Sequence, residues 1–142
     1  MSSKREQILA ALATSLAATP SIGANVYRSR AAGALRAETP MVILEPLQDS
    51  ASEPTIYYVD WQLITRLTIL ARGSIPDQVA DPVVTAVYAR MMADLTVGGL
   101  AYDVEPRGVT WQIGDADAES VEIMCDFVVK YRTALQDMTT GG

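Results

Sequence analysis

The sequence predicts an α+β fold of two layers, in which two main helices pack on one face of a mostly antiparallel mixed sheet. Two long segments, residues 55–72 and 120–132, alternate between apolar and polar residues with the period of two that a half-buried strand requires. Residues 3–18 and 82–95 instead place apolar residues at spacings of three and four, as helices do. The order helix, strands, helix, strands favours both helices lying on one sheet.

The composition fits one globular domain that spans residues 1–142. The net charge of −6 argues against a nucleic-acid-binding module, which needs a basic patch to neutralise phosphates. No segment approaches the roughly 18 apolar residues of a membrane span. Polar residues interrupt the apolar run near the N-terminus, so we expect no signal peptide and a chain that stays in the cytoplasm of the cell that makes it.

The first predicted helix covers residues 3–18. Ser3 and Glu6 match a capping box, in which a hydroxyl and a carboxylate satisfy free amides at the helix start. Pro20 ends this helix. Residues 25–28 form a short strand candidate.

A hairpin is expected next. Residues 41–44 form a short apolar strand, which Pro46 should end. The polar segment 48–54 predicts a loop that joins this strand to residues 55–72 as a hairpin with an extended tip. The long strand is unusual, since strands mostly run about 5–6 residues. It must therefore bend or project beyond its own sheet.

For the second helix we predict Asp81 as the N-cap and Pro82 at the first helical position, because a proline inside the helix would cost about 3 kcal/mol. Gly98 and Gly99 supply a left-handed stop. The expected apolar stripe consists of Val84, Val87, Tyr88, Met91 and Leu95.

Three strands follow the second helix. Residues 102–105 and 109–113 predict two short strands, and residues 120–132 predict a long strand that pairs antiparallel with 55–72. Its buried face should consist of Val121, Ile123, Cys125, Phe127, Val129 and Tyr131. From about residue 135 to residue 142 we expect a disordered tail.

The sequence contains no pattern of catalytic or metal-binding chemistry. Asp115, Asp117 and Glu119 are close together but lack the further ligands of a calcium loop, so they predict a solvated turn. There is no histidine, which excludes a histidine general base and makes a zinc site unexpected. The single cysteine, Cys125, lies on the apolar face of its strand and predicts a small buried side chain.

Trp61 and Trp111 are interpreted as core or interface anchors rather than as ligand stackers. We therefore expect no enzyme, no cofactor and no metal. A protein that acts through its surfaces fits these observations best.

The order of the elements and their local sequences resemble the tail terminator family of long-tailed bacteriophages over nearly the whole chain. The matching features are the opening KREQILAALATSLAA helix, VYRSR, the strand that begins at Pro40, YYVDWQLITRLTILAR, DLTVGGLAYDVEP, a late tryptophan-containing strand and the final FVVKYRT. None of these motifs has a catalytic role in the family.

The resemblance implies a two-layer subunit that assembles into a six-membered ring within the virion tail or neck. Such a ring caps the tail tube, stops its polymerisation and offers a surface to the head–tail connector, while DNA passes through without specific binding. The partners implied are other copies of the chain, the tail tube protein and the connector. Assembly would take place in the host cytoplasm.

Two other functions remain open at this point. One is another neck or head-closure protein of the same particle. The other is a small-molecule-binding α+β domain with a pocket between helix and sheet. Such a pocket requires convergent polar groups on the buried faces, and the sequence offers only Thr65.

Two segments are candidate contact surfaces. Asp49 and Glu53 in the polar segment 48–54, with Tyr57 and Tyr58, should contact a neighbouring subunit or the tail tube, because tyrosines are favoured at protein contacts. The alternative is a solvated tip with Tyr57 in the core. Arg28 and Arg30, followed by Arg36, could form a basic patch for an acidic partner or simply a solvated connection.

Overall fold

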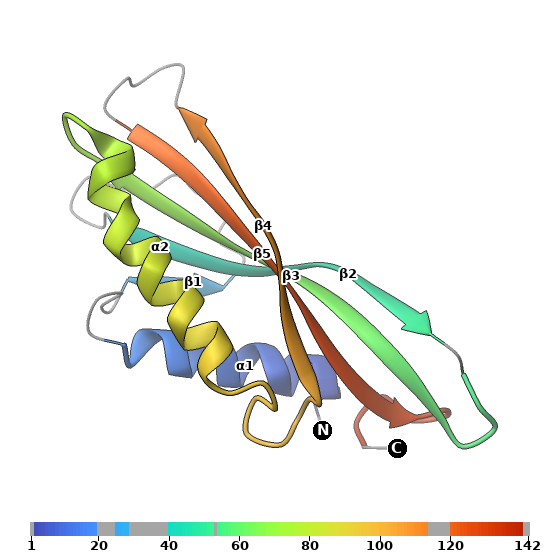
Figure 1. Cartoon of the computed structure of the whole chain (residues 1–142). Helices are drawn as coiled ribbons and strands as arrows, with labels where there is room; N and C mark the ends of the chain where they lie inside the picture. The colour runs from blue at the N-terminus through green and yellow to red at the C-terminus, as the bar shows by residue number, and fades with distance from the viewer. Residues whose placement is uncertain (1, 20–24, 29–39, 53, 114–119, 141–142) are drawn as a thin grey trace.

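The structure is a computed structural model, and it describes residues 2–19, 25–28, 40–52, 54–113 and 120–140. These residues form α1 (Lys4–Ala17), β1 (Val26–Arg28), β2 (Met41–Ser52), β3 (Tyr58–Arg72), α2 (Pro76–Ala93), β4 (Asp103–Ile113) and β5 (Ser120–Ala134). Both helices lie on one face of a single twisted sheet (Figure 1). The predicted two-layer α+β fold is therefore confirmed.

The described strands form one mixed sheet in the order β1-β2-β3-β5-β4. β1 and β2 pair in parallel, and the other three pairs are antiparallel. β3 pairs with β5 over its whole length, from Tyr58 opposite Ala134 to Arg72 opposite Ser120. This pairing confirms the predicted partnership of the two longest segments.

The core lies between the helices and the face of the sheet formed by the odd-numbered residues of β3 and β5. Leu67 is fully buried and Phe127 nearly so, which confirms that both face inward. The hydroxyl of Thr65 lies in the same layer and donates to the carbonyl of Phe127 at 3.3 Å. The helices contribute Ile8, Leu9, Leu12 and Leu16 from α1 and Ala80, Val83, Val87 and Met91 from α2.

The start of α1 confirms the Ser3 half of the predicted cap. The Ser3 hydroxyl accepts the amide of Glu6 at 3.1 Å, which satisfies one of the free donors of the first turn. The Glu6 carboxylate binds Arg28 of β1 instead of contributing to the cap. This ion pair ties α1 to the edge strand β1.

The prediction that Pro46 ends the first strand of the hairpin was wrong. β2 continues to Ser52, and its register with β3 shifts between Pro46 and Gln48. Such an irregularity accommodates a residue that cannot donate a hydrogen bond to the ladder. Residues 48–52, expected to be a loop, are therefore strand, and the turn of the hairpin lies closer to Tyr58.

The predicted start of α2 was also wrong. The helix begins at Pro76, where a missing amide hydrogen costs little, and Pro82 lies inside it. Gln78, whose carbonyl would otherwise accept from residue 82, and Pro82 are both exposed, so water can reach the affected turn. Before the helix the chain turns at Gly73, where a Cβ would lie only 2.9 Å from Cγ2 of Val79.

The buried stripe of α2 differs in part from the predicted one. Val87 and Met91 are buried as expected, whereas Tyr88 is 48% exposed and Leu95 lies beyond the helix. The helix ends at Ala93 rather than at the glycines. The Asp94 carboxylate causes this early end by accepting the amides of Thr96 at 3.0 Å and Gly98 at 2.8 Å.

The two short strands predicted after α2 are one strand, β4, with an irregularity between Pro106 and Gly108. Gly98 and Gly99 do adopt positive φ angles, but in the loop that precedes this strand. The predicted turn at Asp115 and Asp117 falls outside the described residues.

Residues 135–140, within the expected disordered tail, form turns with specific hydrogen bonds. The amide of Lys4 donates to the carbonyl of Met138 at 2.7 Å, and the amide of Ala134 donates to the carbonyl of Thr140 at 3.1 Å. The end of the described chain is thereby fixed to the start of α1. Residues 141 and 142 lie outside the described part.

Candidate interaction surfaces

The long strands continue past both helices and form a strand extension, which we define as residues 49–52 of β2, 58–63 of β3 and 129–134 of β5. Figure 1 shows these three strand ends together at the lower right, beyond α1 and α2. Hydrogen-bond pairing continues to the last residues, with Ser52 opposite Asp60 and Tyr58 opposite Ala134. The overlong strand of the sequence is thus part of a three-stranded projection.

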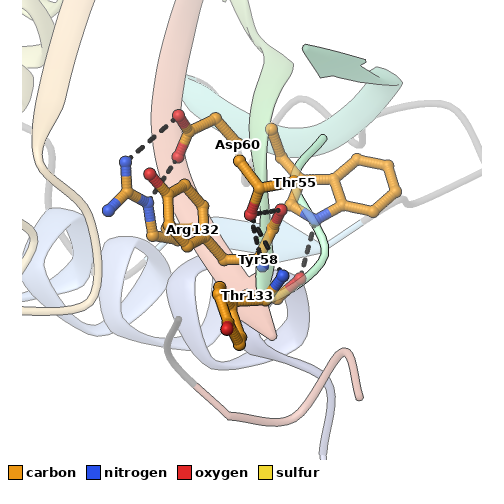
Figure 2. A network of polar contacts seen from close by, with 7 residues as sticks. Thr55, Tyr58, Asp60, Arg132 and Thr133 are labelled. Atoms are coloured by element: carbon orange, nitrogen blue, oxygen red, sulfur yellow. Dashed lines mark hydrogen bonds and ion pairs between the residues drawn. The ribbon is translucent and has the colours of Figure 1, made fainter. Parts of the chain in front are cut away.

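The turn at the end of the extension is well organised. The Thr55 hydroxyl accepts the amides of Tyr57 at 3.1 Å and Tyr58 at 3.0 Å, and the Thr55 amide donates to the Tyr58 carbonyl at 2.8 Å. The carbonyl of Tyr57 also accepts the amide of Leu135 at 3.0 Å. Figure 2 shows Thr55 and Tyr58 facing one another in this turn.

The same turn exposes two large apolar side chains. Ile56 is 77% and Tyr57 is 75% exposed, which places Tyr57 outside the core. We call these two residues the tip. An exposed isoleucine and tyrosine on an ordered turn are suited to a protein contact, because the backbone of the turn loses little conformational entropy on binding.

Tyr58 behaves differently from Tyr57. Its ring lies under the guanidinium of Arg132, 3.7 Å from the ring centroid, and Arg132 also binds Asp60 with its Nε at 2.7 Å (Figure 2). The Tyr58 side chain is therefore partly buried in a cation–π contact within the chain. This leaves Tyr57, rather than Tyr58, as the accessible tyrosine.

Asp49 lies inside the extension and not on an exposed loop. Its carboxylate accepts the hydroxyl of Tyr131 and pairs with Arg5 of α1 at 3.3 Å, and its side chain is only 9% exposed. Burial, followed by this hydrogen bond, raises the pKa of Tyr131 above its usual range. Oδ1 of Asp49 has no hydrogen-bond partner among the described residues.

Trp61 connects this cluster to the neighbouring strand. Its ring stacks on Tyr131 with centroids 6.4 Å apart, and its indole nitrogen donates to the hydroxyl of Thr133 at 2.9 Å. Trp61 is therefore an internal anchor of the extension. This agrees with its interpretation from the sequence as a core or interface anchor. It links β3 to β5 within the extension, next to the Tyr131–Asp49 contact that joins Arg5 of α1.

The face of the sheet opposite the helices carries cross-strand ion pairs. Arg66 binds Asp126 through two hydrogen bonds of 2.9 and 3.0 Å, and Lys130 binds Glu105 at 2.9 Å. Partly exposed pairs of this kind contribute only about 0–1 kcal/mol each. They favour one register, because a shift of β5 by one residue would place Cys125 or Phe127 opposite Arg66.

A groove lies between α2 and β4 on the helical side of the sheet. It has a volume of about 320 Å³ and is lined by Val84, Thr85, Tyr88, Val109, Cys125 and Phe127. Tyr88 packs against Phe127 with ring centroids 6.1 Å apart. Trp111, two residues beyond Val109 on the edge strand β4, is 57% exposed, and Val109 is 39% exposed. This second apolar surface was not predicted.

The remaining predicted contact residues are placed as follows. Arg28 makes a two-pronged pair with the Glu6 carboxylate, at 2.8 and 3.0 Å, and the bond lowers the pKa of Glu6. It is thus engaged within the chain. Arg30 and Glu53, like Arg36, lie outside the described residues.

Burial raises the pKa of the Cys125 thiol to about 11, so this cysteine is a poor nucleophile at neutral pH. No group of three or more potential metal-ligating side chains occurs within the described ranges. Nor does that part of the chain include a helix long and apolar enough to cross a membrane. No protein-family model matches the chain, and a search of curated proteins found no match either.

Proposed function

We propose that the protein is a tail terminator of a long-tailed bacteriophage, a structural protein whose six copies form a ring. In this proposal the ring caps the tail tube, stops its polymerisation and presents a surface to the head–tail connector. DNA passes through it without specific binding, in keeping with the net charge of −6. The partners are other copies of the chain, the tube protein and the connector.

The observation that carries this proposal is the rigid strand extension with its exposed tip. Ile56 and Tyr57 form an adjacent pair of exposed apolar side chains at the end of this ordered projection, and contiguous exposed apolar surface is typical of contact sites. The sequence resemblance supplies the class of assembly. The two-layer α+β fold agrees with the subunit that this class would have.

The proposal is tested on tail tubes polymerised from the tube protein of the same genome. Added protein should shorten the tubes and appear as extra density at one end in electron micrographs. The matched variant Ile56→Ser/Tyr57→Ser should fold normally but leave tube length unchanged. Tubes of equal length with and without the wild-type protein, and with bare ends, would count against a terminator.

The same assay separates the neck alternative. A head-closure protein would bind purified connector and leave growing tubes unaffected. The groove between α2 and β4 is the observation that favours a small-molecule site. Thr85, the Tyr88 hydroxyl and the Cys125 thiol are the polar side-chain groups of its lining, fewer than orienting a ligand usually requires. The terminator therefore remains the proposed function.

A further inference from the structure

The chain presents two apolar surfaces that nothing within its described part covers. One is the tip, Ile56 and Tyr57. The other is the groove between α2 and β4, whose rim includes Tyr88, Val109 and the adjacent Trp111. The first is a convex protrusion of large side chains, and the second is concave and lined largely by carbon atoms. Both surfaces are apolar, and one protrudes where the other is hollow.

The tip cannot enter the groove of its own chain. In the groove, Val109 lies opposite Cys125 of β5. The tip lies just beyond the last pair of β3 and β5, Tyr58 opposite Ala134, and Ala134 is nine residues after Cys125. Nine strand residues span roughly 30 Å, and the paired strands between them do not allow the chain to fold back. Any contact between the two surfaces must join two copies.

We propose that the groove between α2 and β4 receives the Ile56–Tyr57 tip of a second copy, in a head-to-tail contact. This inference rests on the ring proposed above and identifies its subunit contact. Because the tip lies at the end of β3 and the groove lies midway along β5, beside the edge strand β4, each copy uses its tip on one neighbour and its groove on the other. Such a heterologous contact generates a ring when its rotation closes.

The amount of apolar surface is appropriate for the centre of an interface. Tyr57, Tyr88 and Trp111, each about half exposed or more, together offer on the order of 300 Å² of aromatic surface. A groove of about 320 Å³ is also at the lower limit of small-molecule sites, near 300 Å³, and suits inserted side chains. Aromatic anchors that fill pockets carry much of the binding energy at protein interfaces.

Cross-linking tests the contact directly. In a Cys125→Ala background, Tyr57→Cys is mixed with Thr85→Cys and treated with a short bis-maleimide. The contact predicts a covalent dimer in the mixture, in clear excess over a control mixture in which Gln62→Cys, on the opposite face of β3, replaces Tyr57→Cys. The double variant Tyr57→Cys/Thr85→Cys should give a ladder of covalent oligomers that ends at the size of the ring.

Two results would overturn the inference. One is a yield no higher than that of the control mixture. The other is a double variant that stops at a dimer, since this would show two copies pairing reciprocally about a two-fold axis. If the wild-type protein forms rings without this cross-link, only the inference fails. If it forms no rings and also leaves tail tubes unaffected, the proposed function fails with it.

A substitution within the groove provides a second measurement. Tyr88→Glu should weaken self-association by at least about tenfold, measured by sedimentation, because it places a charge in an apolar contact. Tyr102→Glu, which alters a similarly exposed tyrosine outside the groove, is the matched control and should leave association unchanged. Equal effects of the two variants would contradict the contact.

Discussion

Strands β3 and β5 pass through two regions of the sheet, the part covered by the helices and the strand extension, and the two regions differ in the contacts that hold them. Under the helices, the inward face of β3 and β5 is largely apolar and is covered by α1 and α2, as at Leu67. In the strand extension, the corresponding face carries Trp61 and Tyr131, joined by hydrogen bonds to Thr133 and Asp49. The first region is held by packing and the second largely by polar contacts.

This difference indicates separate roles for the two regions. The helix-covered part has the dense apolar packing that supplies most folding free energy. In the extension, the buried side chains form a specific hydrogen-bonded arrangement. This arrangement orients the tip and adds little to stability. Substitutions should therefore affect unfolding most under the helices and affect assembly most at the tip.

The largest expected effect is on the helix-covered core. Leu67→Ala or Phe127→Ala should lower the free energy of unfolding by about 2–5 kcal/mol, because each removes fully packed atoms and leaves a cavity. Urea unfolding followed by circular dichroism measures the change. Gln62→Ala, at an exposed position of the same strand, is the control and should change it by less than about 0.5 kcal/mol. If a core variant changed the free energy of unfolding as little as this control, Leu67 and Phe127 would have to lie on the outward face of the sheet.

Within the extension, Asp49→Ala should cost about 1–3 kcal/mol, because the buried hydroxyl of Tyr131 loses its acceptor and Arg5 loses its partner. The same unfolding experiment measures it. Gln48→Ala, at the exposed neighbouring residue, should have little effect. If both changes were equally harmless, Asp49 would belong to a solvated loop, as the sequence alone predicted.

Alkaline pH should destabilise both regions. The pKa of Cys125 is raised from 9.0 to about 11, and that of Tyr131 is raised above 10.0, so the unfolded chain releases these protons at lower pH than the folded chain. Stability is then fully present below pH 9 and falls as pH rises, by at most about 3 kcal/mol for Cys125 once pH exceeds 11.

Chemical unfolding between pH 8 and pH 11 under reducing conditions checks this dependence. Cys125→Ala should remove the part of the decline that begins near pH 9, and Tyr131→Phe should remove the part that begins near pH 10. A wild-type protein whose stability is constant over this range would show that neither group is protected by the fold.

The smallest effect is expected at the edge of the sheet. Glu6→Gln should lower stability by no more than about 1 kcal/mol, because the pair with Arg28 is partly exposed. The difference from wild type should shrink further in 1 M salt, which screens the pair. A loss of several kcal/mol in urea unfolding would mean that this pair is a main support of the fold.

The sequence predicted those features that depend on local periodicity. The alternation in residues 55–72 and 120–132 identified β3, β5 and their pairing, and the inward positions of Leu67 and Phe127 followed from it. The start of α1 was equally local, since the hydroxyl of Ser3 caps an amide only three residues away.

The errors arose where distant residues override a local signal. Pro46 should end a strand, yet pairing with β3 continues beyond a bulge. Pro82 should begin a helix, yet burial of Ala80 in the core extends the helix toward Pro76. Asp49 resembles a loop residue until Tyr131, 82 positions later, meets it. The groove between α2 and β4 is likewise formed by three separate segments.

Imaging of the purified protein by negative-stain electron microscopy, with a mass measurement, tests the central claim most directly. We predict six-fold rings of about 92 kDa, the mass of six chains of 15.3 kDa, either free in solution or seated on the ends of tail tubes. Single copies in both situations, with no density on tube ends, would contradict the account.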